Sequence, residues 1–216
     1  MTETQAIGID QARALAGDAA LWPRVRDFLW NFAAQIHPSW LADVPGASGL
    51  SGISDSPRVR KYVLSALGVE PCFHAFPKED GSRLLLLDGS TLESVVMWLG
   101  ALSCAGRLRT VTGGSSVRAL KAALPGVYPD VFSYTAYFGR MEAQHPTDDP
   151  AGVVAAGRDI LAGALSSLPG PLAARLALKL PKSLAADGEP RASAGVGTVM
   201  KLLKLKFPEA YKLCCS

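Results

Sequence analysis

Cys72 and His74 are the closest pair of residues in this sequence that could perform nucleophilic chemistry. A cysteine nucleophile needs a base, usually a histidine, and a third group that orients the base. No Gly-x-Ser-x-Gly elbow or comparable motif flanks the pair, and residues 71–83 are polar and predicted to be irregular. We therefore keep a small Cys/His enzyme as the alternative hypothesis and expect no catalytic residue.

The spacing of the cysteines also argues against a metal site. Zinc ligands usually come in pairs two to four residues apart, whereas Cys104 lies in an apolar run and Cys214 and Cys215 are adjacent. The same spacing does not indicate a disulfide framework. From this spacing we expect no metal, and we expect no other cofactor. Residues 1–10 lack the features of a secretion signal, so we expect a cytoplasmic protein.

Glycine and serine residues at 113–116 precede a predicted helix and could bind an anion through their backbone N–H groups. The segment lacks the lysine and the spacing of a phosphate-binding loop. Helix capping is therefore the favoured interpretation.

Three groups of residues are candidates for binding a partner. The first follows a helix break, where a tryptophan either packs into the core or is presented to a partner protein. The second follows a long apolar run. The third is the basic C-terminal part, since eight basic and three acidic residues lie from 168 onward. A solvated helix face and an amphipathic helix on anionic lipid both remain open for the third group. The candidates are His37, Pro38 and Trp40, then Arg107 and Arg109, then Lys201, Lys204 and Lys206.

The composition favours helices as the elements that position these residues. Hydrophobic residues make up 49% of the 216-residue chain, and alanine and leucine outnumber the residues that favour strands. The net charge of +3 is too small to indicate a nucleic-acid partner. We expect an all-α protein that forms a single compact multi-helix domain.

The segment 90–106 is predicted to be the buried central helix of that domain, from about 91 to 105. Ser90 and Glu93 form a capping box, and Gly106 is expected to end the helix in a left-handed cap. The segment has no polar stripe, so other helices must cover it on all sides. Its uncharged run is shorter than the roughly 20 residues that a membrane span needs.

Further helices are expected on both sides of this central one. Residues 84–87 could form a helical turn or a minor extended segment, because four leucines are too few to decide. Residues 141–150 could separate an N-terminal core from a basic C-terminal helical part. The other predicted helices cover 11–20, 23–35, 57–67, 117–124, 128–138, 150–168, 172–180 and 198–207, and residues 44–57 form a loop.

Several short motifs resemble the K component of bacterial type III secretion systems, the SctK or YscK family. The match is most specific over 84–138, and from 141 onward it is limited to helical character and a basic end. The motifs are Asn31-Phe32, His37-Pro38-Ser39-Trp40-Leu41, Trp98-Leu99-Gly100-Ala101, Arg107-Leu108-Arg109 and Val117-Arg118-Ala119-Leu120.

This resemblance implies a cytosolic, helical and non-enzymatic adaptor of the sorting platform, the assembly beneath the inner-membrane ring. Its protein partners would be the cytosolic domain of the ring protein SctD and the protein SctQ, with no nucleic acid. The resemblance also implies a place at the cytosolic face of the inner membrane, with at most peripheral association through the apparatus. The loop 44–57 has no family pattern.

Overall fold

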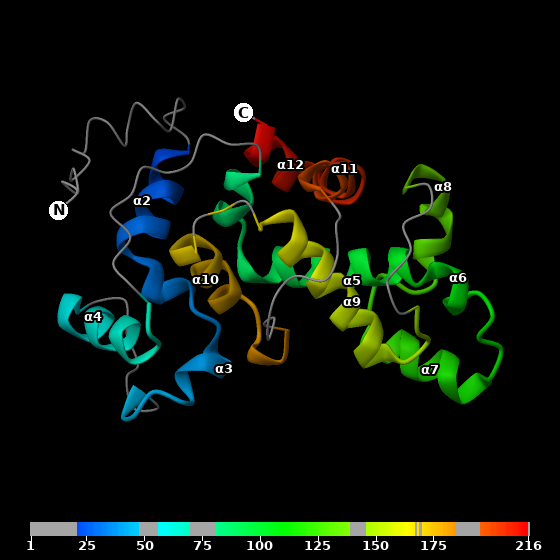
Figure 1. The fold of residues 1–216 in the computed structure, drawn as a ribbon, viewed down its shortest axis with the longest axis horizontal. Helices are drawn as coiled ribbons and strands as arrows, with labels where there is room; N and C mark the ends of the chain where they lie inside the picture. Colours follow the sequence, from blue (N-terminus) through cyan, green and yellow to red (C-terminus); the bar gives the residue numbers. More distant parts are fainter. Residues whose placement is uncertain are drawn as a thin grey trace. The chain divides into compact units, whose positions relative to one another are not determined.

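The computed structural model describes residues 21–47, 56–69, 81–138, 146–166, 168, 170–184 and 195–215 (Figure 1). Within these ranges the regular elements are α-helices and 3₁₀ helices, without a strand, which confirms the expected all-α class. The predicted helix 11–20, the centre of the loop 44–57 and the pair Cys72 and His74 lie outside the described residues.

The chain divides into two compact units. Unit 1 comprises residues 1–89, 168–183 and 212–216, and unit 2 comprises 90–167 and 184–211. The described residues on both sides of 141–150 belong to unit 2, and the single domain and its sub-boundary stay predictions.

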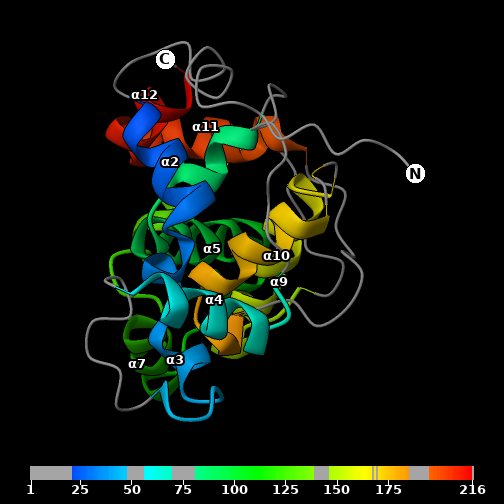
Figure 2. The same ribbon diagram turned by 90° about the vertical axis from the view of Figure 1, so that its left-hand side faces the viewer.

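Unit 1 is built around the buried face of α2 (Trp22–Trp30) and the 3₁₀ helix η1 (Phe32–Gln35). Pro23 occupies the first turn of α2, where its missing N–H costs no hydrogen bond. Helix α10 (Gly170–Lys179) lies beside the C-terminal end of α2 and contacts η1 (Figure 2). The unit also contains α3 (Pro38–Leu41), α4 (Pro57–Ala66) and the 3₁₀ helix η3 (Ser82–Leu86).

Unit 2 contains the predicted central helix, α5 (Gly89–Ser103), whose first residue falls in unit 1. Helix α9 (Pro150–Ala164) lies across it (Figure 1). A Cβ atom on Gly100 would stand 2.0 Å from the carbonyl oxygen of Val153, and one on Gly157 would stand 1.9 Å from that of Val96. Only glycine permits this close crossing. Trp98 is 3% exposed, which confirms that α5 is buried.

Shorter helices complete unit 2. They are α6 (Ala105–Leu108), α7 (Gly114–Ala123), η4 (Asp130–Ser133), α8 (Thr135–Phe138) and α11 (Val196–Lys206). Helix α12 (Pro208–Cys215) passes from unit 2 into unit 1 at residue 212, and the 3₁₀ helix η5 (Lys182–Leu184) spans the boundary between residues 183 and 184.

The structure corrects three details of the sequence prediction and decides a fourth, residues 84–87, that the sequence left open. Gly106 is no left-handed cap, because the chain forms another turn, α6, that buries Leu108. Residues 84–87 mostly belong to η3, so they form a helical turn rather than a strand. The aromatic segment 128–138 is two short helices, η4 and α8, which are separated at Tyr134. Helix α7 begins at Gly114 and no side chain caps it.

Candidate interaction surfaces

His37 and Pro38 begin α3 in unit 1. The Nδ1 atom of His37 accepts a hydrogen bond from the backbone N–H of Ser39 at 3.2 Å, and Pro38 occupies the first turn. The hydroxyl oxygen of Ser39 accepts a hydrogen bond from the backbone N–H of Lys182 at 2.9 Å. The predicted His-Pro-Ser motif is therefore a helix cap that is hydrogen-bonded to the start of the 3₁₀ helix η5.

Trp40 is half-buried on α3. Its indole Nε1–H donates to the carbonyl oxygen of Leu180 at 2.9 Å, and the ammonium of Lys182 lies 5.8 Å from the ring centroid. Lys182 also forms an ion pair with Asp43. These contacts hold the indole in one orientation and leave part of the ring accessible.

Arg109 lies against the aromatic segment of unit 2. Its guanidinium donates to the hydroxyl of Thr135 at 2.7 Å and to the carbonyl oxygen of Phe132 at 3.4 Å, and it stands 5.7 Å from the centroid of the Phe132 ring. Arg107 is exposed in the last turn of α6. Of the two predicted arginines, Arg109 thus has a defined position and Arg107 projects into solvent.

The lysines of α11 also lie over aromatic rings. The Lys206 ammonium stands 4.2 Å from the ring centroid of Trp98 and 4.3 Å from that of Tyr134, within the range of cation–π attraction. These two rings pack edge to face with centroids 5.4 Å apart. Lys201 lies 5.6 Å from the centroid of Phe138. Tyr137, the residue before Phe138 on α8, is exposed and adds apolar surface.

The structure therefore brings Arg109, Lys201 and Lys206 to one aromatic segment, η4 and α8. Lys204 instead lies 5.9 Å from the ring centroid of Tyr211 on α12. The predicted residues of α3 belong to unit 1 and those of α6 and α11 to unit 2.

Sequence reasoning missed two buried cations on α10, and it counted them as part of an electropositive tail. Arg175 is 1% exposed, and its Nη1 donates to the carbonyl oxygens of Phe28 at 2.8 Å and Leu29 at 3.2 Å. Lys179 is 2% exposed and donates to the carbonyl oxygens of Leu85 at 2.6 Å and Leu87 at 2.9 Å.

Burial lowers the pKa of Lys179 from 10.5 to about 7, and the positive charge of Arg24 adds to this effect, while the carboxylate of Asp88 opposes it. The helical period could have revealed both cations. Arg175 and Lys179 recur at i and i+4 on the side of α10 that also buries Leu172 and Leu176.

Two negative findings apply to the described ranges alone. No group of three potential metal-ligating side chains is present in them. None of their helices combines the length and the apolar character that crossing a membrane requires.

The fold and these surfaces define an all-α protein whose candidate sites place lysine or arginine side chains over aromatic rings. The family described as YOP proteins translocation protein K (YscK) matches residues 26–215. The chain therefore belongs to the YscK family and is a type III secretion protein. No curated protein and no solved structure gives a match.

This membership confirms the family resemblance seen in the sequence. The matched range extends well beyond residue 138, where the specific motifs end, and it includes all the candidate residues. The C-terminal helices α9 to α12 are therefore part of the family's domain as well.

Proposed function

We propose that this protein is a non-enzymatic adaptor of the type III secretion sorting platform, which links the cytosolic domain of SctD to SctQ. The family match over residues 26–215 carries the proposal, because it covers almost the whole chain. The adaptor acts in the cytoplasm, at the cytosolic face of the inner membrane, and contacts the membrane at most through the apparatus.

Two separate surfaces support an adaptor role. A protein that links two partners needs a docking site for each, and candidate residues occur in both units. Trp40 and its neighbours on α3 form the candidate in unit 1, and the lysines of α11 with the exposed Tyr137 form the candidate in unit 2. Each contains an accessible aromatic residue, Trp40 or Tyr137, and tryptophan and tyrosine are enriched among the residues that contribute most to binding.

A bridging assay tests the proposal directly. The cytosolic domain of SctD is immobilised, and retention of SctQ is measured with and without this protein. We expect SctQ to be retained only when the protein is present. Retention of SctQ in its absence, or no retention in its presence, would contradict the linking role.

A variant and its control then test whether the α11 surface binds one of the partners. Replacing Lys201 and Lys204 with glutamate changes the α11 surface, while the fold of unit 1 keeps all its contacts. We expect this variant to lose one partner and retain the other. The matched control replaces Arg118 and Lys121, both exposed on α7, with glutamate and should retain both partners.

A further inference from the structure

Helix α3 is held in unit 1 by hydrogen bonds rather than by burial. None of its four residues is buried. Hydrogen bonds join α3 and its cap to the segment 178–182, from the backbone N–H of His37 to the Leu178 carbonyl at 2.8 Å, from the Trp40 indole to the Leu180 carbonyl, and from the backbone N–H of Lys182 to the Ser39 hydroxyl. A single helical turn is not stable by itself, so these bonds and the cap decide whether α3 persists.

The cap of α3 depends on the protonation state of His37. The Nδ1 atom accepts a hydrogen bond from the backbone N–H of Ser39 at 3.2 Å and lies 2.8 Å from the Ser39 hydroxyl oxygen. A ring nitrogen accepts a hydrogen bond only while it carries no hydrogen, and in the imidazolium ion both ring nitrogens carry one. This cap therefore requires the neutral ring.

Protonation of His37 changes the hydrogen bonds of Ser39. With a neutral ring, the Ser39 hydroxyl can donate to Nδ1 while its oxygen accepts from the backbone N–H of Lys182. With a protonated ring, Nδ1 becomes a donor, and it faces the backbone N–H of Ser39, which is a donor as well. That N–H loses its acceptor, and the loss of such a cap shifts a helix equilibrium by about 5-fold.

The charged side chains around this cap already have partners. Those of α10, of η5 and of the turn after α3 are Arg175, Lys179, Lys182 and Asp43. The first two donate to backbone carbonyls of α2 and η3, and the other two form an ion pair. Burial lowers the pKa of Lys179 to about 7, but a neutral amine still donates, so its bonds to η3 do not require the charge.

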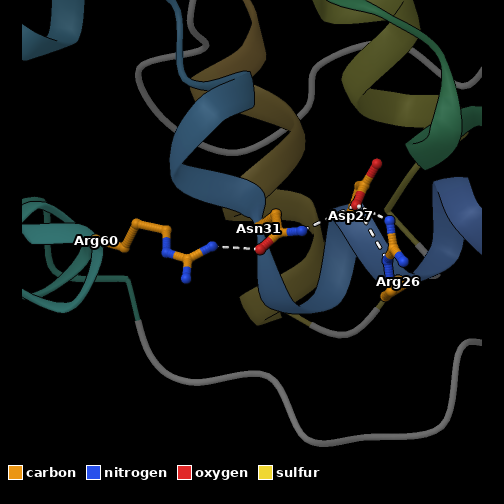
Figure 3. Close-up of polar contacts among 4 residues, drawn as sticks. All are labelled: Arg26, Asp27, Asn31 and Arg60. Atoms are coloured by element: carbon orange, nitrogen blue, oxygen red, sulfur yellow. Dashed lines mark hydrogen bonds and ion pairs between the residues drawn. The ribbon is translucent and has the colours of Figure 1, made fainter. Parts of the chain in front are cut away.

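The contact between α4 and the end of α2 provides a contrast within unit 1. Arg60 on α4 donates to the amide oxygen of Asn31, and the amide nitrogen of Asn31 donates to the carboxylate of Asp27 at 2.9 Å (Figure 3). Histidine is the side chain that ordinarily changes charge between about pH 5 and 8, whereas arginine stays charged and an amide does not titrate. We therefore expect this contact to be insensitive to pH in that range.

We infer that His37 is a proton switch: the neutral ring caps α3 and keeps the Trp40 indole bound to Leu180, and protonation at mildly acidic pH uncaps α3 and releases the indole. The inference goes beyond the proposed function, because it concerns contacts within unit 1 and needs no partner protein. Trp40 is a candidate docking residue, so the switch makes the α3 surface sensitive to acidification.

The test compares the wild-type full chain with His37→Asn and His37→Ala at about pH 5.5 and about pH 8. The amide oxygen of asparagine accepts from a helix N–H without titrating, and alanine has no acceptor. His74, His145 and Lys179 are present in all three proteins, so their titration cancels in the comparison. The measurement is the hydrogen-exchange rate of the Trp40 indole N–H by NMR, with the signal assigned by its loss in Trp40→Phe.

We expect the wild type and His37→Asn to exchange this hydrogen at rates within about 2-fold of each other at pH 8. At pH 5.5 the wild type should exchange it about 5-fold faster than His37→Asn, and His37→Ala should be the faster variant at both pH values. Comparison at the same pH removes the intrinsic pH dependence of exchange. The side-chain amide signals of Asn31 are the internal control and should be the same in all three proteins.

Three results would overturn the inference. The first is a wild type that matches His37→Asn at both pH values, and the second is an equal acceleration at pH 5.5 in both proteins. The third is a His37 ring that stays neutral at pH 5.5, which the ring nitrogen signals of the same samples report. Circular dichroism verifies folding, and if His37→Ala does not fold, the comparison of the wild type with His37→Asn decides by itself.

Discussion

Helices α10 and α11 have similar sequences and opposite environments. Both carry cations among leucines, and in both the cations lie over aromatic rings. In α10 of unit 1, however, Arg175 and Lys179 are buried, whereas Lys201 and Lys204 of α11 in unit 2 are exposed.

The difference lies in the backbone that faces each helix. The cations of α10 meet carbonyl oxygens where α2 and η3 end, and the last carbonyls of a helix have no partner within it. A buried cation that donates to them satisfies both groups at once. For the α11 cations the described contacts are with rings, which hold a cation at the surface without removing it from water. The comparison teaches that a lysine or arginine in a leucine-rich helix is buried where the unpaired carbonyl groups at the end of another helix need hydrogen-bond donors.

Arg175→Met should have the largest effect on stability. The substitution removes the donors to the carbonyls of Phe28 and Leu29 and leaves a side chain that cannot replace them. We expect the free energy of unfolding to fall by about 3 kcal/mol. Urea unfolding followed by circular dichroism measures this change. A loss below about 0.5 kcal/mol would show that the buried cation of α10 is no more important than a surface one.

Lys179 should make stability depend on pH. Its pKa is about 7 in the folded protein and 10.5 in the unfolded chain, so between these values the unfolded chain binds more protons. Stability therefore rises with pH across this window, by at most about 1.4 kcal/mol per pH unit, and the contribution is least favourable below pH 7.

The measurement compares the wild type with Lys179→Met by urea unfolding at pH 7 and pH 9, with a reductant present. The variant lacks the titrating group, so its stability should rise less than that of the wild type. Parallel pH profiles would show that burial of Lys179 has no energetic consequence.

Lys206→Met should have an intermediate effect. The ammonium lies between two rings, Trp98 and Tyr134, and two cation–π contacts of a partly buried lysine contribute about 1 kcal/mol. Thermal unfolding measures the loss. Lys206→Arg is the conservative control, since it keeps the charge over the rings and should retain most of the stability.

Lys201→Met should have the smallest effect, within about 0.5 kcal/mol of the wild type in the same assay. Its ammonium is exposed and has one ring, Phe138, at 5.6 Å. A loss as large as that of Arg175→Met would remove the distinction between the two helices.

The sequence by itself determined the fold class and the buried central helix. Residues 94–106 carry no charge and no polar stripe, so no arrangement of that helix leaves a face for water, and Trp98 is accordingly buried. The sequence motifs also indicated the family whose model matches residues 26–215.

The tertiary structure alone decided which side chains are buried and which form surfaces. A helical period shows that Arg175 shares a face with leucines, but the carbonyls that accept its hydrogen bonds lie about 150 residues earlier in the chain. Likewise, Arg60 meets Asn31 only because α4 packs at the end of α2. Local sequence determines local periodicity. Whether a charge is buried, or two helices are hydrogen-bonded to each other, depends on partner groups that lie far away in the sequence and that folding brings close.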